Sequence, residues 1–241
     1  SQDTLLAVQD LVVEDYLYDW EAGLNINEIL LKETFVNLKK SKDGIWNYQF
    51  ILKHFNSKKD TSDSLAWNIS LHQLKFQDAR FNFTDEPDIA NPENKKGSIN
   101  WAAMQWQSDE LTFNQIYANP EKISLFVNAF NMKEIGGYEV KNLHAAMVLD
   151  KDGVIMDDVE VQTKKSKITS EVRVNWSGQD TIDLMKSDWD VHLSAYPFQL
   201  CDLSLLDKRW ETENQSTRCN IQAKGNVDQL ELNSMQLEST Q

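Results

Sequence analysis

The chain contains four histidines, the residues best suited to metal binding and to proton transfer near neutral pH. None of them has a second histidine at a metal-ligand spacing such as H-x-x-x-H: His54, His72, His144 and His192. We expect each one to be a surface or sheet-face residue. The sequence also has no G-x-S-x-G nucleophile motif and no phosphate-binding loop, so it indicates neither hydrolase nor nucleotide chemistry.

An acidic run between positions 150 and 160 resembles a cation-binding loop. Its carboxylates are Asp150, Asp152, Asp157, Asp158 and Glu160. An EF-hand loop needs its glycine at the sixth position, and Gly153 comes two places too early. The D-K-D-G sequence is instead typical of a hairpin turn, followed by an exposed strand. The sequence therefore predicts a protein that is not an enzyme and that has no catalytic residues, metal or cofactor.

Two cysteines, Cys201 and Cys219, are separated by a polar loop from Asp207 to Ser216. In an oxidising compartment a disulfide between them is permitted, and it would contribute about 3 kcal/mol through loop entropy. Two buried free thiols are the other interpretation. The sequence leaves both open.

The stretch LHQLKFQDARFNF, residues 71–83, has an apolar spacing that is neither helical nor strictly alternating. Its large or apolar side chains are Leu71, Leu74, Phe76, Ala79, Phe81 and Phe83. The same slots recur in VQDLVVEDYLYDW from position 8, in INEILLKETFVNL from position 26, and again from positions 101 and 227. Because the distances between copies differ, this is not a solenoid of fixed repeat length. The pattern indicates one supersecondary unit built several times with loops of different length.

Strand geometry gives an interpretation of the slips in this unit. Residues two apart in a strand share a face, and a two-residue hairpin loop places its flanking residues side by side on that face. A turn at Gln77-Asp78 would therefore bring Phe76 next to Ala79. Because the loop contains no Gly, a slightly longer loop is an equal alternative. The equivalent positions in the other copies are Glu14-Asp15, Lys32-Glu33 and Asn233-Ser234.

The earlier slip, from Leu71 to Leu74, leaves too few residues for a strand between two hairpins, so it predicts a bulge that bends the strand and keeps its apolar face inward. The unit thus predicts bent antiparallel strands that are apolar on one face. We expect the inward face to contain the residues that recur in equivalent slots: Val8, Leu11, Val13, Ile26, Ile29, Leu31, Leu71, Leu74, Phe76, Phe81, Phe83, Leu230 and Leu232.

The composition is that of a β-rich protein. Eight Trp, six Tyr and ten Phe among 241 residues favour strands, and eight Gly with four Pro argue against low complexity. Short helices are expected only at Ile182 to Asp188 or within Asp202 to Trp210. We predict an all-β fold, an elongated and curved antiparallel sheet that curls into a groove, with very little helix.

The polar, turn-rich stretches do not divide the chain into clear domains. We expect residues 1–241 to form a single β-rich segment, with one candidate sub-boundary in the loop 85–98. The sequence has no apolar run of 18 residues and no signal peptide, and it opens SQDTLL without Met. We interpret the chain as a segment of a longer protein.

The charge argues against nucleic acid as a partner. With 24 basic and 38 acidic residues the net charge is −14, which repels a phosphate backbone. The lysine clusters at 39–42, 58–59, 95–96 and 164–165 lie next to Asp, Asn, Ser or Gly. We expect these lysines to be solvated side chains of loops or edge strands.

Three stretches in order resemble a known family: DTLLAVQDLVVEDYLYDWEAGLNINEILLKETFVNLKKSKDGIWNYQFILKHF, WNISLHQLKFQDARFNFTDEP and ISLFVNAFNMKEIGGYEVKNLHAAMVLDKDGVIMDDVEVQTKKSKI. The W-N-Y-Q-F-I segment after D-G and the K-E-x-x-G-Y-x-V-K-N-L block are characteristic. The chain resembles the N-terminal part of the TamB-like proteins of Bacteroidetes, in the AsmA superfamily, over residues 3–176. It departs from them in lacking the expected membrane anchor and in having Ala79 or Thr34 at a turn position that is often Gly.

This resemblance implies a periplasmic segment of a large protein that is held in the inner membrane through an N-terminal anchor absent from these residues. It implies a β-taco-like sheet with an apolar interior that carries phospholipid acyl chains between membranes. Contact with an outer-membrane barrel protein would involve regions outside this segment, in outer-membrane biogenesis.

Three other interpretations of the apolar face stay open from the sequence alone. The face can be an ordinary closed core, which is the commoner fate of such residues. The chain can be a cell-envelope module whose exposed Trp and Tyr stack on glycans. It can also be a scaffold that docks outer-membrane barrel precursors by adding their strands to a sheet edge.

Overall fold

The computed structural model describes residues 4–19, 23–49, 67–89, 99–176, 187–226 and 229–239. The strands belong to one 14-stranded sheet. In chain order they are β1 (Leu6–Ala7), β2 (Asp10–Asp19), β3 (Gly23–Lys32), β4 (Phe35–Lys40), β5 (Ile69–Asp85), β6 (Ala103–Ala118), β7 (Lys122–Phe130), β8 (Met132–Glu134), β9 (Glu139–Asp150), β10 (Gly153–Thr163), β11 (Lys167–Asn175), β12 (Asp188–Gln199), β13 (Ser216–Asn226) and β14 (Gln229–Ser239). Two short 3₁₀ helices, η2 (Leu200–Leu205) and η3 (Lys208–Trp210), lie between β12 and β13.

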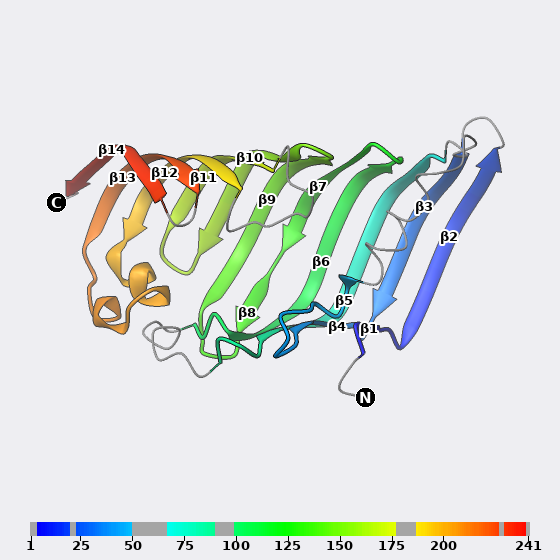
Figure 1. The fold of residues 1–241 in the computed structure, drawn as a ribbon, viewed down its shortest axis with the longest axis horizontal. Helices are drawn as coiled ribbons and strands as arrows, with labels where there is room; N and C mark the ends of the chain where they lie inside the picture. Colours follow the sequence, from blue (N-terminus) through cyan, green and yellow to red (C-terminus); the bar gives the residue numbers. More distant parts are fainter. Residues whose placement is uncertain are drawn as a thin grey trace.

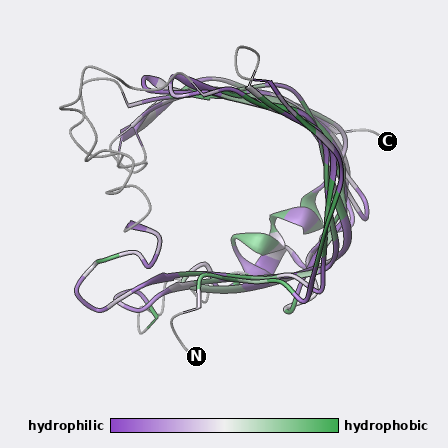
Figure 2. Ribbon diagram, turned by 90° about the vertical axis from the view of Figure 1, so that its right-hand side faces the viewer, coloured by the Kyte–Doolittle hydropathy of each residue, from purple (hydrophilic) through white to green (hydrophobic). Residues whose placement is uncertain are grey.

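The strands are stacked along the long axis of the molecule, from β2 at one end to β14 at the other (Figure 1). Among the described strands, β2 pairs only with β3 and β14 pairs only with β13. Seen along the stacking direction, the strands bend and give the sheet a C-shaped cross-section (Figure 2). The predicted all-β, elongated and curved fold with very little helix is confirmed.

The sheet is mixed, whereas the sequence predicted antiparallel pairing throughout. Strands β3 and β4 both run parallel to β5. The remaining pairs are antiparallel, and β1 and β2 pair with β4 and β3 in that way. Because β3 and β4 follow one another in the same direction, they act as one long bent strand beside β5.

The hairpin predicted at Gln77-Asp78 is wrong, because β5 continues without reversal through both residues. Glu14-Asp15 and Asn233-Ser234 likewise lie inside single strands, β2 and β14. Lys32-Glu33 marks the change from β3 to β4, and the chain does not reverse there either. The sequence slip therefore records a bend within a strand at each of these places.

A residue with left-handed backbone produces the bend in β5. Asp78 has a φ of 54°, and β5 keeps the same register with β6 on both sides of it, with Gln77 opposite Glu110 and Ala79 opposite Ser108. The strand therefore bends at Asp78 without a bulge in its pairing. Phe76 and Phe81, on opposite sides of the bend, contact each other with ring centroids 6.3 Å apart. The bulge predicted between Leu71 and Leu74 is not present in β5, because this strand keeps the same register with β3 and β6 across these residues.

Left-handed backbone at residues other than glycine recurs along the chain. Non-glycine residues with positive φ are Asp15, Glu33, Asp78, Gln115 and Asp158. Each follows an apolar residue by two positions and precedes another small or apolar residue. The bends of neighbouring strands are aligned, because Glu33 lies beside Asp78 on the next strand. Aligned bends curve the whole sheet. Aspartate is among the non-glycine residues that tolerate this conformation best.

The structure also tests the predicted turn and the predicted short helices. The turn at Asp150 to Gly153 is confirmed, and the Asp150 carboxylate accepts hydrogen bonds from the backbone N–H groups of Asp152 and Gly153 at 2.8 and 3.1 Å. The helix predicted within Asp202 to Trp210 is present as the short helices η2 and η3. The alternative at 182–188 lies mostly outside the described residues, as do most of the loop 85–98 and the lysines at 58–59 and 95–96.

The lysines of β4 correct the expectation that all lysine clusters are freely solvated. Lys39 and Lys40 are half-buried, and they form ion pairs with Glu86 and Asp85 at 2.7 and 3.1 Å. Lys40 also lies 5.8 Å from the centre of the Trp46 ring. Lys164 and Lys165 are exposed as expected, although Lys164 forms an ion pair with Glu139 at 3.1 Å.

The substitution Asp78→Gly should raise the free energy of unfolding by about 1 kcal/mol, because glycine adopts positive φ without the steric cost of a Cβ atom. Asp109→Gly is the matched control, since Asp109 lies at the same level of β6 without a positive φ. That change should lower stability by about 0.5–1 kcal/mol. Urea denaturation of both variants measures the difference, and equal destabilisation would contradict the left-handed backbone at Asp78 as the origin of the bend.

Candidate functional site: the apolar concave face

Contacts near helix η2 identify the concave side of the sheet. Helix η2 lies inside the curve (Figure 2), and its Asp202 lines the same hollow as Tyr138. The Tyr138 ring packs edge-on against Trp106, with centroids 6.5 Å apart. Trp106 pairs with Phe81 across β6 and β5, and cross-strand partners share a face. Phe81 therefore faces the inside of the curve.

A chain of packed side chains extends this assignment along the sheet. Phe76 contacts both Phe81 and Phe113, and the second pair of ring centroids is 6.0 Å apart. Phe113 packs in turn against a cluster of buried residues formed by Val127, Ala145 and Val159. The apolar face of β5 and β6 is thus continuous with the apolar face of β7, β9 and β10, and all of it is concave.

Register places apolar residues in rows that run along the stacking direction, across the strands. We call these the axial rows. The longest follows cross-strand partners from β2 to β14 through Tyr18, Leu24, Ile69, Ala118, Ile123, Leu149, Val154, Val174, Trp189, Gly225 and Leu230. A second row consists of Leu125, Met147, Met156, Val172, Val191, Ala223 and Leu232. A third consists of Leu143, Val161, Ile168, Ala195, Cys219 and Leu237.

The side chains of the concave face are incompletely buried, because the described strands form a single sheet. One further row crosses five strands through Leu11, Leu31, Phe76, Leu111 and Phe130. Leu111, near the bend of the sheet, is 1% exposed, whereas Leu11 in β2 is 63% exposed. Phe76, between them, is half-buried. Exposure of the large apolar side chains thus varies along this row, from sealed in β6 to open in β2.

The structure brings most of the predicted inward residues together. Leu11, Val13, Ile29, Leu31, Leu74 and Phe76 share cross-strand rows on the face that Phe81 also occupies. Ile26 and Leu71 pair with each other in the next row, where Leu71 is buried. Phe83 packs against Trp46, with ring centroids 5.3 Å apart.

Three predicted residues differ from the rest. Val8 lies between β1 and β2, outside both strands, and is half-buried. Leu232 is in the second axial row and is 55% exposed. The side chain of Leu230 lies outside the described residues.

Sequence reasoning missed the part of the concave face between β9 and β13. The axial rows there include Leu149, Val174 and Trp189, none of which was singled out. Each of these strands alternates in sequence, but the repeated unit is weak in them. The signal in these strands is the alternation of apolar and polar residues. Alternation alone does not show which of the two faces is concave.

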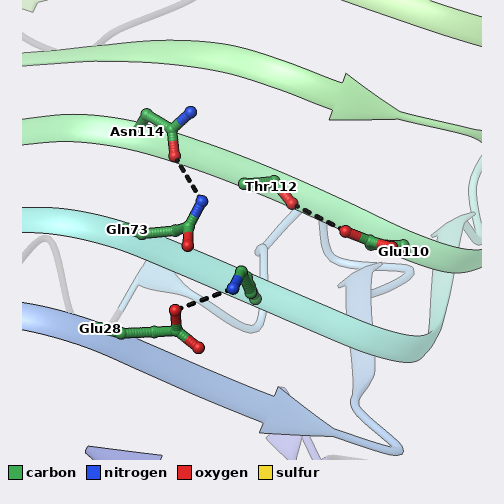
Figure 3. Close-up of polar contacts among 6 residues, drawn as sticks. Glu28, Gln73, Glu110, Thr112 and Asn114 are labelled. Carbon is green, nitrogen blue, oxygen red and sulfur yellow. Dashed lines mark hydrogen bonds and ion pairs between the residues drawn. The ribbon is translucent and has the colours of Figure 1, made fainter. Parts of the chain in front are cut away.

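The convex face of β3, β5 and β6 carries polar contacts. Lys75 forms an ion pair with Glu28 at 2.8 Å, and the Gln73 amide donates a hydrogen bond to Asn114 at 3.0 Å (Figure 3). These residues alternate along the strands with the inward Ile29, Leu74 and Phe113. In these three strands a polar outer surface lies opposite the apolar inner one. On other strands the convex face also exposes apolar side chains, Phe126 of β7 and Ile155 of β10.

Helix η2 covers one part of the concave face. The Thr163 hydroxyl donates a hydrogen bond to the Asp202 carboxylate at 2.6 Å, which ties η2 to the turn between β10 and β11. Burial, and secondarily the negative charge of Asp202, raises the pKa of Tyr138 to about 12. Tyr138 is therefore a neutral hydrogen-bonding group at every physiological pH.

Both cysteines are buried, and neither forms a disulfide, so the structure has the second of the two predicted states. Burial also raises the pKa of the Cys219 thiol, which reduces its thiolate fraction near neutral pH. We expect slow alkylation of the folded protein at pH 8 and full alkylation of both thiols after unfolding without reductant. Mass spectrometry of the alkylated chain measures this, and a thiol that labels only after reduction would contradict it.

The described residues contain no group of three or more His, Cys, Asp or Glu side chains arranged to hold a metal ion. Within the same residues, no helix is long and apolar enough to cross a membrane. Comparison with protein-family models, with curated proteins and with solved structures finds no match to this chain.

Proposed function

We propose that the concave face carries the acyl chains of phospholipids along the axial rows, as one periplasmic segment of a longer TamB-like protein of the cell envelope. The observation that carries this proposal is one row that runs from β2 to β14, with further apolar rows beside it over parts of the sheet, combined with incomplete burial of many of their side chains. A face that served only as a protein core would be covered by a second layer.

The dimensions of the face suit acyl chains. Neighbouring strands are about 4.8 Å apart, so a row from β2 to β14 is roughly 50 Å long. The hydrocarbon core of a bilayer is about 30 Å thick and two chains deep, so one chain spans about 15 Å. Each methylene that leaves water for this face contributes about 0.8 kcal/mol.

The charge of the chain fits recognition through the acyl chains rather than through the headgroup. The net charge is −14, and the residues near the axial rows are apolar, so no basic pocket is needed for a phosphate. In the proposal the headgroup stays in water beside the open side of the curved sheet. Transfer between the inner and outer membranes would use an N-terminal anchor and an outer-membrane barrel protein outside these residues.

Native mass spectrometry of the purified chain tests the proposal. We expect phospholipid to be bound after expression in a Gram-negative host, and to return when delipidated protein is mixed with phosphatidylethanolamine vesicles. Soluble glycan fragments offered in place of vesicles should not bind. Retention of glycan without lipid would favour the glycan-binding alternative, and binding of neither would leave the proposed carrier function unsupported.

A further inference from the structure

A small hollow lies beside helix η2, on the concave side of the sheet and at the ends of its strands. Three segments line it: the turn 136–139 before β9, the turn with Lys164 and Lys165 between β10 and β11, and the helical segment with Asp202 and Glu211. Its volume is about 160 Å³, and it is open to water on one side. Pockets for drug-sized ligands have about 300–1,000 Å³, so this hollow fits a small polar group and not a whole lipid.

Hydrogen bonds hold two of these segments in place. The Ser166 backbone N–H donates to the Thr163 hydroxyl at 2.8 Å and closes the turn between β10 and β11. The same hydroxyl donates to Asp202 of η2, and the Gln199 N–H donates to the Ser166 hydroxyl at 2.9 Å. Thr163 and Ser166 are both buried. The lysine-bearing turn and η2 are therefore fixed relative to each other before any ligand binds, which lowers the entropic cost of binding.

Two basic and three acidic side chains line the hollow: Lys164, Lys165, Glu139, Asp202 and Glu211. Lys164 forms an ion pair with Glu139 at 3.1 Å. Lys165 donates a hydrogen bond to the neutral Asn214 at 3.2 Å. Among the described residues, this leaves one cation, Lys165, and two anions, Asp202 and Glu211, without an ion pair. A ligand with one negative and one positive group matches this arrangement.

Two half-buried groups of the hollow have hydrogen-bonding capacity to spare. Asp202 uses Oδ2 to accept from the Thr163 hydroxyl, and no other described residue donates to its carboxylate. The Tyr138 hydroxyl has no hydrogen bond with a described residue, although its ring packs against Trp106. An ammonium group has three N–H donors, so it can donate to the Asp202 carboxylate and to the Tyr138 oxygen together.

The hollow is within reach of a lipid whose acyl chain lies on the axial rows. Thr163 follows Val161 of the third axial row by two residues, about 7 Å along β10. Tyr138 packs against Trp106, which pairs with Phe81 on the concave face. One acyl chain spans about 15 Å, so it can lie on this part of the face while its headgroup is in the hollow.

We propose that this hollow binds the phosphoethanolamine headgroup of a phospholipid, with the phosphate at Lys165 and the ammonium group at Asp202 and Tyr138. The inference rests on the proposed carrier function, because the acyl chains bring the lipid to the concave face and supply most of the affinity. The hollow then selects among lipids. Phosphatidylglycerol has the same phosphate but no ammonium group, so it leaves Asp202 without a cation.

Native mass spectrometry with mixed vesicles tests this selection. The vesicles contain equal amounts of phosphatidylethanolamine and phosphatidylglycerol with the same acyl chains, and we expect about fivefold more phosphatidylethanolamine in the bound fraction. Asp202→Asn should make the two lipids bind equally, because the amide oxygen still accepts from Thr163 but carries no charge. Tyr138→Phe keeps the ring against Trp106 and should reduce the preference about twofold, which provides a second variant if Asp202→Asn does not fold.

The lysine should act on both lipids alike. Lys165→Gln should lower the binding of each about threefold and leave their ratio unchanged, because both lipids have the phosphate. Lys167→Gln is the matched control, since Lys167 precedes Ile168 of the third axial row and therefore points to the convex face, where it pairs with Glu160 at 3.2 Å. This control should change neither the amount of bound lipid nor the ratio.

The outcomes separate the headgroup site from the carrier function. Equal binding of the two lipids by the unchanged chain, or a preference that survives both Asp202→Asn and Tyr138→Phe, would overturn the headgroup site and leave the carrier function standing. Binding of neither lipid would overturn both. Isothermal titration calorimetry with soluble phosphoethanolamine distinguishes the two sources of this chemistry. We expect much weaker binding than that of the lipid, and equally tight binding would overturn the lipid assignment in favour of a soluble ligand.

Discussion

Phe81→Glu should leave the sheet folded and abolish the binding of phospholipid. Phe81 is half-buried on the concave face, between Phe76 and its cross-strand partner Trp106. A carboxylate there can reach water from an open face, so we expect the free energy of unfolding to fall by only about 1–2 kcal/mol. Phe81 contacts Phe76, which lies in one of the apolar rows, so the charge would lie beside the path of an acyl chain, and moving a chain past it has a desolvation cost of several kcal/mol.

Asn82→Glu is the matched control for this prediction, because Asn82 is the next residue of β5 and points to the opposite face. It should retain both stability and lipid binding. Thermal unfolding and native mass spectrometry of the two variants separate the possible outcomes. Unfolding of Phe81→Glu would show that the face is a closed core, because an unpaired carboxylate in a sealed core is strongly destabilising.

Leu111→Ala should lower the free energy of unfolding by about 2–4 kcal/mol, the largest effect that we expect from an apolar truncation in this chain. Leu111 is 1% exposed, lies between Phe76 and Phe130 in its row, and is next to the bend of β6. Removal of its methyl groups leaves a cavity that the bent strands cannot easily close.

Leu11→Ala provides a control of the same residue type, in the same row and on the same face. Leu11 is 63% exposed, so its truncation should cost less than about 1 kcal/mol. Urea denaturation measures both changes. Equal losses at the two positions would contradict a concave face that is sealed only at its bends, and would indicate that β2 is covered in solution.

The repeated apolar spacing was sufficient to predict strands with one apolar face, but not how each slip is resolved. A hairpin and a bulge both restore an apolar residue to the same face, and both accept polar residues at the slip. The residue that decided β5 is Asp78, whose left-handed backbone lets the strand bend and continue. An Asp, Glu or Gln two places after an apolar residue and just before another is the signal that favours a bend within a continuous strand here.

Register was the second quantity that the sequence did not determine. The axial rows depend on which residues of neighbouring strands face each other, for example Leu149 with Val154 across a hairpin and Leu24 with Ile69 across a parallel pair. The first pairing follows from the D-K-D-G turn, because a short turn sets the register of its hairpin. The second joins strands whose connection is long, and local sequence carries no information on its register.

Photo-crosslinking along β5 and β6 tests the central claim most directly. A photoreactive phenylalanine placed at Phe81 or Phe113 faces the concave side, and the same group at Asn82 or Asn114 faces the convex side. After incubation with phosphatidylethanolamine vesicles, we predict lipid adducts from the first two positions and none from the second two. Adducts from neither pair, or equal adducts from both, would contradict a concave face that carries acyl chains.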